Sequence, residues 1–269
     1  MTRAASGDIL VEERKVGEGD ALVCVVRLNR PAKLNALTRA MLEQLTELFR
    51  AFAERADVRA VILTGTGQAA FSAGTDISEL EGLDEQGARA TAERGQETCE
   101  AIELCDVPVI AAVNGLAAGG GGELALACHL RIAAAHTAFS LPELKLGMIP
   151  AYGGTQRLAR AVGHGRALAA MLAGDPLTAD EALRFGLVNR VVPAEQVMTE
   201  ADALAHTLCE LAPLALRACL QAVTRGARLP LSDGLALEAE LFSRLFSTED
   251  VREGTRAFLE KRAPQFRGK

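Results

Sequence analysis

Short apolar runs alternate with stretches of helical periodicity through the first half of the chain. The runs are residues 21–28 (ALVCVVRL), 60–64 (AVILT), 108–113 (PVIAAV) and 131–135 (RIAAA). Short apolar runs of this length are typical of strands that are covered on both faces. We therefore expect four buried strands at these positions.

The segments between these runs have the period of amphipathic helices. Thr38 is a residue type that caps helix N-termini, and it predicts a helix reaching about Arg55. A second polar, alanine-rich stretch over residues 84–104 has similar spacing. Alternating strands and helices predict an α/β fold with a largely parallel sheet. One face of the first predicted helix carries Met41, Leu45, Leu48, Phe49 and Phe52.

The pattern changes near residue 200, where the strand signals end. Helical sequence rich in Ala, Leu and Glu continues to the C-terminus, with an interruption at residues 228–230 (RLP). We predict a core over residues 1–199 and an all-helical region over residues 200–269. A small helical tail cannot bury its many apolar side chains alone, so we expect it to pack on the main body or on another subunit. These side chains include Leu235, Leu237, Leu241, Phe242, Leu245 and Phe246.

Composition fits one large globular domain, or one domain with an appendage. The chain has 269 residues, of which 49% are hydrophobic and 24% charged. The formal net charge of −6 argues against a general nucleic-acid surface. An anionic ligand would therefore need a local basic patch.

The cysteine pattern, and a first segment unlike a targeting signal, both favour a location in the cytoplasm. The six cysteines include no C-x-x-C pair, and we expect them to be reduced and mostly buried. Residues 1–20 are polar and carry acids, unlike a signal or transit peptide. No uninterrupted apolar run reaches membrane-spanning length, so we expect no membrane partner.

The most informative chemical feature is a glycine run that leads into an acid. Residues 119–122 are four glycines, Glu123 follows them, and Glu143 lies twenty positions later. Glycines let a ligand approach the unpaired amides of a helix N-terminus, where negative charge is favoured. Backbone donors for an oxyanion, together with carboxylates that move protons, suit chemistry beside a carbonyl.

A third segment strengthens this interpretation. Residues 71–77 (FSAGTDI) follow the predicted strand 60–64, and their small residues could expose further amides. Two such segments from neighbouring strands could direct two N–H groups at one oxygen. Simpler alternatives stay open: Glu123 could only stabilise its helix, the glycines could only allow close packing, and Asp76 could only cap a turn.

Other common motifs are missing from the sequence. The glycine run does not fit G-x-G-x-x-G, since Leu124 and Ala125 stand where its last glycine would fall. No P-loop and no G-x-S-x-G occurs. The four histidines lack H-E-x-x-H spacing, and we expect no metal site.

Six segments of the chain together form a recognisable pattern. They are residues 28–37 (LNRPAKLNAL), 71–77, 114–123 (NGLAAGGGGE), 142–150 (PELKLGMIP), 153–158 (GGTQRL) and 257–266 (AFLEKRAPQF). With these segments the chain resembles the crotonase superfamily, the enoyl-CoA hydratase and isomerase family, over nearly its whole length. The resemblance implies a spiral core of β-β-α turns and a helical C-terminal trimerisation region, assembled as a homotrimer or a dimer of trimers.

The resemblance also implies the roles of individual residues. The oxyanion donors fall on the backbone amides of Thr75 and Gly120, and the catalytic acids on Glu123 and Glu143. Thr75 stands where the family's hydratases usually have alanine. Tyr152 replaces a residue that is often small, and both departures could alter the acyl pocket.

An enoyl-CoA hydratase is the activity that the resemblance implies first. Water adds across the 2,3 double bond of a 2-enoyl-CoA, Glu123 accepts the proton of the water, and Glu143 supplies one to Cα. No cofactor is bound permanently, because coenzyme A arrives as part of the substrate. By the same resemblance the substrate and CoA contacts are Arg30, Lys33, Asn35, Ala36, Ala73, Gly74, Asp76, Ile77 and Lys261. Lys33 and Arg30 are the first candidates for binding the anionic CoA, and Lys261 and Arg262, reaching from a neighbouring subunit, are the second.

Two other functions remain as alternatives. The first is an enoyl-CoA isomerase or another crotonase-type acyl-CoA enzyme. In this family, members that only shift a double bond often lack one of the two glutamates, whereas this chain has both. The second is a non-catalytic RNA-binding protein on the same fold. Overall acidity and the presence of both acids argue against the second, so no nucleic-acid partner is predicted. We expect a short or medium acyl chain.

Overall fold

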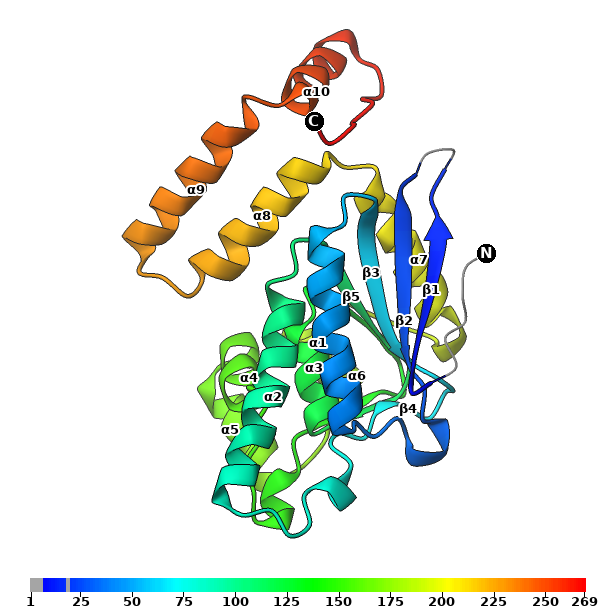
Figure 1. The fold of residues 1–269 in the computed structure, drawn as a ribbon, viewed down its shortest axis with the longest axis vertical. Helices are drawn as coiled ribbons and strands as arrows, with labels where there is room; N and C mark the ends of the chain where they lie inside the picture. Colours follow the sequence, from blue (N-terminus) through cyan, green and yellow to red (C-terminus); the bar gives the residue numbers. More distant parts are fainter. Residues whose placement is uncertain (1–6, 18–19) are drawn as a thin grey trace.

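The chain folds around two β-sheets, the larger of which has six strands (Figure 1). The computed structural model describes residues 7–17 and 20–269. The first two strands of the large sheet are antiparallel, and all the later pairs are parallel. In spatial order its strands are β1 (Ile9–Lys15), β2 (Leu22–Leu28), β3 (Val58–Gly65), β5 (Val109–Val113), β7 (Leu130–Ala134) and β10 (Arg190–Val192).

The small sheet contains the remaining strands of the chain. Each turn of the chain gives one strand to the large sheet, the next to the small sheet, and then forms a helix. This order repeats as β3–β4–α2, β5–β6–α3 and β7–β8–α4, which is the predicted spiral of β-β-α turns. The small sheet contains β4 (Ala70–Ser72), β6 (Leu116–Ala118), β8 (Ala138–Ser140) and β9 (Leu177–Thr178).

Helices cover both faces of the large sheet. Alternate side chains of each strand enter one of two apolar clusters: one is packed by α1, α2 and α3, the other by α7. The helices are α1 (Arg39–Glu54), α2 (Glu85–Glu103), α3 (Gly120–Ala127), α4 (Gly154–Val162), α5 (His164–Ala173), α6 (Ala179–Arg184), α7 (Val197–Cys209), α8 (Pro213–Gly226), α9 (Leu231–Leu245) and α10 (Glu249–Glu260). Short 3₁₀ turns occur at Pro31–Lys33, Ile77–Glu79, Glu143–Leu146 and Ala194–Gln196.

The four strands and the first helix lie where the hydrophobic pattern predicts them, to within a few residues. The Thr38 side chain accepts a hydrogen bond from the Met41 amide and caps α1, which ends at Glu54. The pattern missed β1, β10 and the whole small sheet. β1 is a partly exposed edge strand paired antiparallel to β2, and the strands of the small sheet are only two or three residues long. Such elements carry too little periodicity to be detected.

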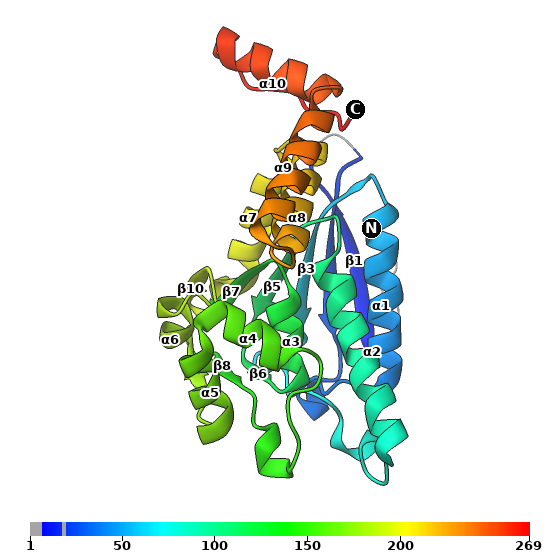
Figure 2. The ribbon, with the colours of Figure 1, turned by 90° about the vertical axis from the view of Figure 1, so that its left-hand side faces the viewer.

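Only helices follow the last strand, as the sequence pattern predicts, but the first of the four α-helices belongs to the main body. α7 packs Val197, Ala201 and Ala205 on the large sheet, and the predicted boundary at residue 199 falls within it. α8 and α9 lie side by side and extend away from the sheets, and α10 lies at that end of the molecule (Figures 1 and 2). The part that projects therefore begins at α8.

All six cysteines are free, and four of them are buried. Within the described part of the chain, no single helix is long and apolar enough to span a bilayer. One helix pair, Ala194–Cys209 and Pro213–Gly226, is together long and apolar enough to span a bilayer. This rests on length and composition only, and the pair is bent by 110°.

Candidate active site

The glycine run forms the junction between β6 and α3. Gly119 has a positive φ of 49°, and a Cβ atom there would lie 3.0 Å from the Glu143 Oε1 atom. A side chain at this position would be strained and would also crowd the acid. Gly120 begins α3, so its amide lies at the unpaired N-terminus of that helix.

The second segment lies directly against this junction. Gly74 follows β4 with a φ of 95°, and a Cβ atom there would lie 2.8 Å from the Ala118 carbonyl oxygen and 3.1 Å from the Gly120 nitrogen. Leu37 holds the segment by donating to the Gly74 carbonyl and accepting from the Asp76 amide. The structure therefore brings residues 74 and 75 beside Gly120. Within the described residues, neither the Thr75 amide nor the Gly120 amide donates to a backbone carbonyl.

Glu123 is buried and anchored by one of its two oxygens. Its side chain projects from the first turn of α3, and the residue is 2% exposed. Oε1 accepts hydrogen bonds from the amides of Tyr152 (2.8 Å) and Gly154 (2.6 Å). Burial raises the pKa of this carboxyl to about 7, helped by the charge of Glu143 and opposed by the two amides. Both protonation states are therefore accessible near neutral pH.

Glu143 begins the 3₁₀ turn after β8 and lines the same cavity. Burial raises its pKa as well. Its Oε2 atom is buried and has no hydrogen-bond partner among the described residues. A buried polar atom without a partner is costly, and it commonly marks a place where a water molecule or a ligand binds.

These groups share one cavity of about 290 Å³. Its polar wall contains Thr75, Gly120, Glu123 and Glu143, so the structure brings together the four residues that the sequence assigned to catalysis. The remainder of the lining is largely apolar, which suits an acyl group. It includes Ile77, Leu80, Ala88, Ala92, Leu146, Met148 and Ile149.

Tyr152 also lines this cavity, and no catalytic or binding role was assigned to it from sequence. Its hydroxyl lies 2.8 Å from the Thr75 Oγ1 atom, while its amide binds Glu123. Thr75 and Tyr152, the two residues that depart from the family pattern, are thus in direct contact. The sequence offered one signal: Tyr152 is the only tyrosine, and it stands where the family often has a small residue. That signal does not reveal the contact with Thr75.

Several of the residues predicted to contact CoA form hydrogen bonds with one another instead. Arg30 donates to the Asp76 carboxylate and to the Ala36 carbonyl, at 2.9 and 2.8 Å. Hydrogen bonds from Ser78 and Arg30 lower the pKa of Asp76. The buried Asn35 side chain donates to the carbonyls of Thr66 and Ala70 and accepts from the Arg30 amide. Arg30, Asn35 and Asp76 therefore hold the loop together through their side chains.

Other predicted contacts are differently placed. Ala73, Gly74 and Ile77 line the cavity, and Ile77 is 53% exposed at its mouth. Lys33 is exposed at the end of the first 3₁₀ turn. Lys261 follows α10, at the opposite end of the molecule from the loop that carries Glu143 (Figure 2). It would reach this site only from another subunit.

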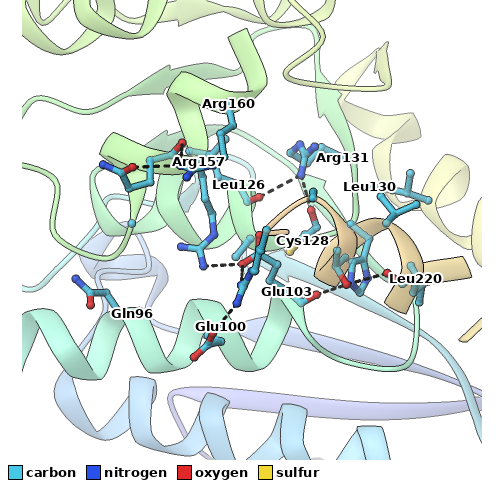
Figure 3. A pocket seen from close by; sticks show the side chains of 18 of the residues that line it. Gln96, Glu100, Glu103, Leu126, Cys128, Leu130, Arg131, Arg157, Arg160 and Leu220 are labelled. Atoms are coloured by element: carbon cyan, nitrogen blue, oxygen red, sulfur yellow. Dashed lines mark hydrogen bonds and ion pairs between the residues drawn. The ribbon is translucent and has the colours of Figure 1, made fainter. Parts of the chain in front are cut away.

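A second cavity, of about 1130 Å³, lies between the core and α8 and is lined by neither Glu123 nor Glu143. Its polar side includes Arg157, which donates to the Glu103 carboxylate at 2.9 Å, and Figure 3 shows this pair beside Glu100. Ala92, Ile149 and Ala151 line both cavities, so the two are neighbours. Among the described residues, no cluster of His, Cys, Asp or Glu is arranged to hold a metal ion.

Known proteins resemble the chain along nearly its full length. The profile of the family described as enoyl-CoA hydratase/isomerase matches residues 18–269. The short-chain-enoyl-CoA hydratase of Clostridium acetobutylicum is 42% identical, over 91% of this chain and 94% of its own. The crotonyl-CoA hydratase of Syntrophomonas wolfei is 39% identical, over 94% and 98%. The crystal structure of an enoyl-CoA hydratase from Bacillus anthracis superposes with a TM-score of 0.92 at 38% identity, covering 98% of this chain and all of the other.

Proposed function

The chain belongs to the enoyl-CoA hydratase/isomerase family, and we propose that it is an enoyl-CoA hydratase that converts a 2-enoyl-CoA thioester to the 3-hydroxyacyl-CoA. Relatives named for this hydration are 39–42% identical over more than nine-tenths of the chain. The observation that carries the proposal is the single cavity shared by Glu123, Glu143 and the segments of Thr75 and Gly120.

The backbone amides of Thr75 and Gly120 would bind the thioester oxygen. As water attacks Cβ, the electrons of the double bond move toward the carbonyl, and negative charge develops on that oxygen as an enolate. Preorganised N–H donors stabilise this charge, and removing one such donor typically costs about 3–4 kcal/mol in other enzymes. The adjacency of the two segments and the absence of backbone acceptors for both amides support this role.

The two carboxyl groups divide the proton transfers between them. Glu123 in its ionised form takes the proton from the attacking water, while its anchored Oε1 fixes the orientation of the group. Glu143 in its protonated form gives a proton to Cα and completes the addition. Burial raises the pKa of both groups, and neighbouring carboxylates disfavour double ionisation, so we expect the two acids to titrate as a coupled pair.

The test is the hydration of crotonyl-CoA by Glu123→Gln and Glu143→Gln, assayed separately. Each substitution should lower kcat by about 10²-fold or more, the typical contribution of a general acid or base. Glu47→Gln, on the exposed side of α1, serves as the matched control. Near wild-type rates in both site variants would refute the assignment. Lost hydration with retained shifting of a 3-enoyl double bond would instead identify an isomerase.

Coenzyme A would enter as part of the substrate, and Lys33 is the cation that we assign to its phosphates. Arg30 is held by Asp76, whereas Lys33 is exposed beside the same loop. A Lys33→Ala variant with an unchanged KM for crotonyl-CoA would exclude this contact.

We further propose a homotrimer or a dimer of trimers, in which Lys261 of one subunit could approach the site of the next. The large apolar side chains exposed on α9 and α10, such as Phe242 and Phe258, support an assembly. Location in the cytoplasm is part of the same proposal, supported by six free cysteines.

A further inference from the structure

The Tyr152 ring is wedged between two helices at positions where only glycine leaves room. A Cβ atom at Gly95 of α2 would lie 1.9 Å from the Tyr152 Cδ1 atom, and one at Gly120 of α3 would lie 2.7 Å from Cε2. The ring therefore fills the space that two missing side chains provide. It is 3% exposed and cannot swing toward either helix without a collision.

Polar contacts fix the same residue at three further points. The hydroxyl bonds to Thr75, the amide donates to Glu123, and the carbonyl accepts from Arg157 at 3.0 Å. Burial raises the pKa of the phenol to about 12, so the hydroxyl stays neutral across the working range of an enzyme. Tyr152 is thus a rigid part of the cavity wall.

This wall stands between the acyl cavity and the larger cavity under α8. Gln96, which follows Gly95, and Gly153, which follows Tyr152, line the large cavity, whereas the Tyr152 ring lines only the small one. Gln96 also donates to the Ala151 carbonyl at 2.9 Å and closes the boundary beside the ring. Figure 3 shows Gln96 projecting from α2 at the edge of the large cavity.

The acyl cavity is small for an acyl-CoA site. Its volume of about 290 Å³ lies just below the roughly 300–1,000 Å³ usual for ligand pockets. The thioester carbonyl, the reacting carbons and the attacking water must share this volume with the acyl tail. The large cavity offers about 1130 Å³ immediately beyond the wall.

Resting on the proposed hydratase activity, we infer that Tyr152 determines substrate specificity. Its ring, wedged between Gly95 and Gly120, closes the acyl cavity and restricts the enzyme to short 2-enoyl thioesters. The large cavity beyond it is the space that a longer acyl chain would enter if the ring were absent. Tyr152 does not take part in the proton transfers.

The experiment compares kcat/KM for crotonyl-, octenoyl- and dodecenoyl-CoA in three variants. In the wild type we expect kcat/KM to fall as the chain lengthens. Tyr152→Ala should raise the ratio of dodecenoyl to crotonyl activity by about tenfold or more, since a few extra methylenes in a pocket are worth at least that much. Tyr152→Phe keeps the ring and should keep the wild-type ranking of substrates. Gly165→Ala, on α5 with no atom within 4 Å of its added Cβ, is the control.

Three results would overturn the inference. One is an unchanged ratio in folded Tyr152→Ala, and another is a wild type that already prefers dodecenoyl-CoA. The third is a shift of the ratio in Tyr152→Phe equal to that in Tyr152→Ala, because the hydrogen bond rather than the ring would then set the limit. General loss of stability lowers all rates together and does not move the ratio.

Binding separates this inference from the proposed reaction. If the wild type hydrates none of the three substrates, the proposed function fails. Calorimetric affinities for butyryl-, octanoyl- and dodecanoyl-CoA then test, independently of catalysis, whether the Tyr152 ring limits acyl-chain length. Tyr152→Ala should gain affinity only for the longer esters. Should Tyr152→Ala not fold, Tyr152→Leu replaces it in both measurements.

Discussion

At the scale of single residues, the site depends on burying an acid without neutralising it completely. Glu123 gains two backbone hydrogen bonds that favour its charged form, yet burial outweighs them. A carboxyl whose pKa rises from 4.5 to about 7 destabilises the folded protein at every pH at which it must ionise. The group thus lowers stability at neutral pH, where the proposed mechanism needs it to accept a proton.

The sign of this linkage gives a prediction for the pH dependence of stability. Because folding raises the pKa of Glu123, the folded state retains its proton more strongly than the unfolded state. The favourable contribution is fully present below about pH 4.5 and is lost as pH rises through 7. Glu123→Gln should therefore raise the free energy of unfolding at pH 8 by up to about 3 kcal/mol, and much less at pH 5. Denaturant titrations at both pH values measure it.

The glutamine retains an amide oxygen that can accept the hydrogen bonds of Tyr152 and Gly154, so lost contacts should not obscure the effect. Glu47→Gln, at an exposed position, should show the pH dependence of the wild type. Identical pH profiles for Glu123→Gln and the wild type would contradict the raised pKa.

At the scale of elements, the proposed oxyanion site is formed by two segments that follow strands and pack together without intervening side chains. β4 leads into Gly74 and β6 leads into Gly120, and β4 and β6 are parallel neighbours in the small sheet. Parallel pairing places both exits at the same edge, and the glycines then let the segments touch. The small sheet, which the hydrophobic pattern missed, is therefore what aligns the two amides.

This close contact predicts a specific cost for one methyl group. A Cβ atom at Gly121 would lie 2.4 Å from the Ser72 carbonyl oxygen and 2.6 Å from the Ser72 Cβ atom. Gly121→Ala must push α3 away from β4, which typically costs about 1–3 kcal/mol. The Gly120 amide would move with the helix, so hydration of crotonyl-CoA should fall together with the melting temperature.

Gly165→Ala is the matched control, because it makes the same change inside helix α5 where the added methyl meets no atom within 4 Å. It should leave activity intact and stability equal or higher. Wild-type activity and melting temperature in Gly121→Ala would show that the contact between α3 and β4 is not rigid.

At the scale of the whole molecule, the projecting helices have more apolar surface than one chain can cover. On α9, Leu231 is 78% exposed and Phe242 62%, and on α10 Phe258 and Leu259 both exceed 80%. Isolated exposed apolar residues are common, but so many on consecutive helices indicate an interface.

An added charge on this surface should break the proposed assembly. Phe242→Asp, on α9, places a carboxylate where we expect contact between subunits, and sedimentation should then show a smaller species than the wild type. Ala51→Asp adds the same charge on the exposed side of α1 and should leave the assembly intact. A wild type that sediments as a monomer, or a Phe242→Asp variant with unchanged sedimentation, would refute the interface.

The sequence by itself determined the α/β alternation, the helical C-terminal region and the family, and it singled out the two glutamates that line one cavity, because periodicity and local motifs can be recognised without the fold. Only the tertiary structure decided which groups meet. It placed Arg30 on Asp76 rather than leaving it free, brought Thr75 to Tyr152 across 77 positions, and gave α7 to the main sheet. These outcomes depend on packing between segments distant in the chain, and a linear pattern carries no information about the space that glycines such as Gly95 leave open for a partner elsewhere.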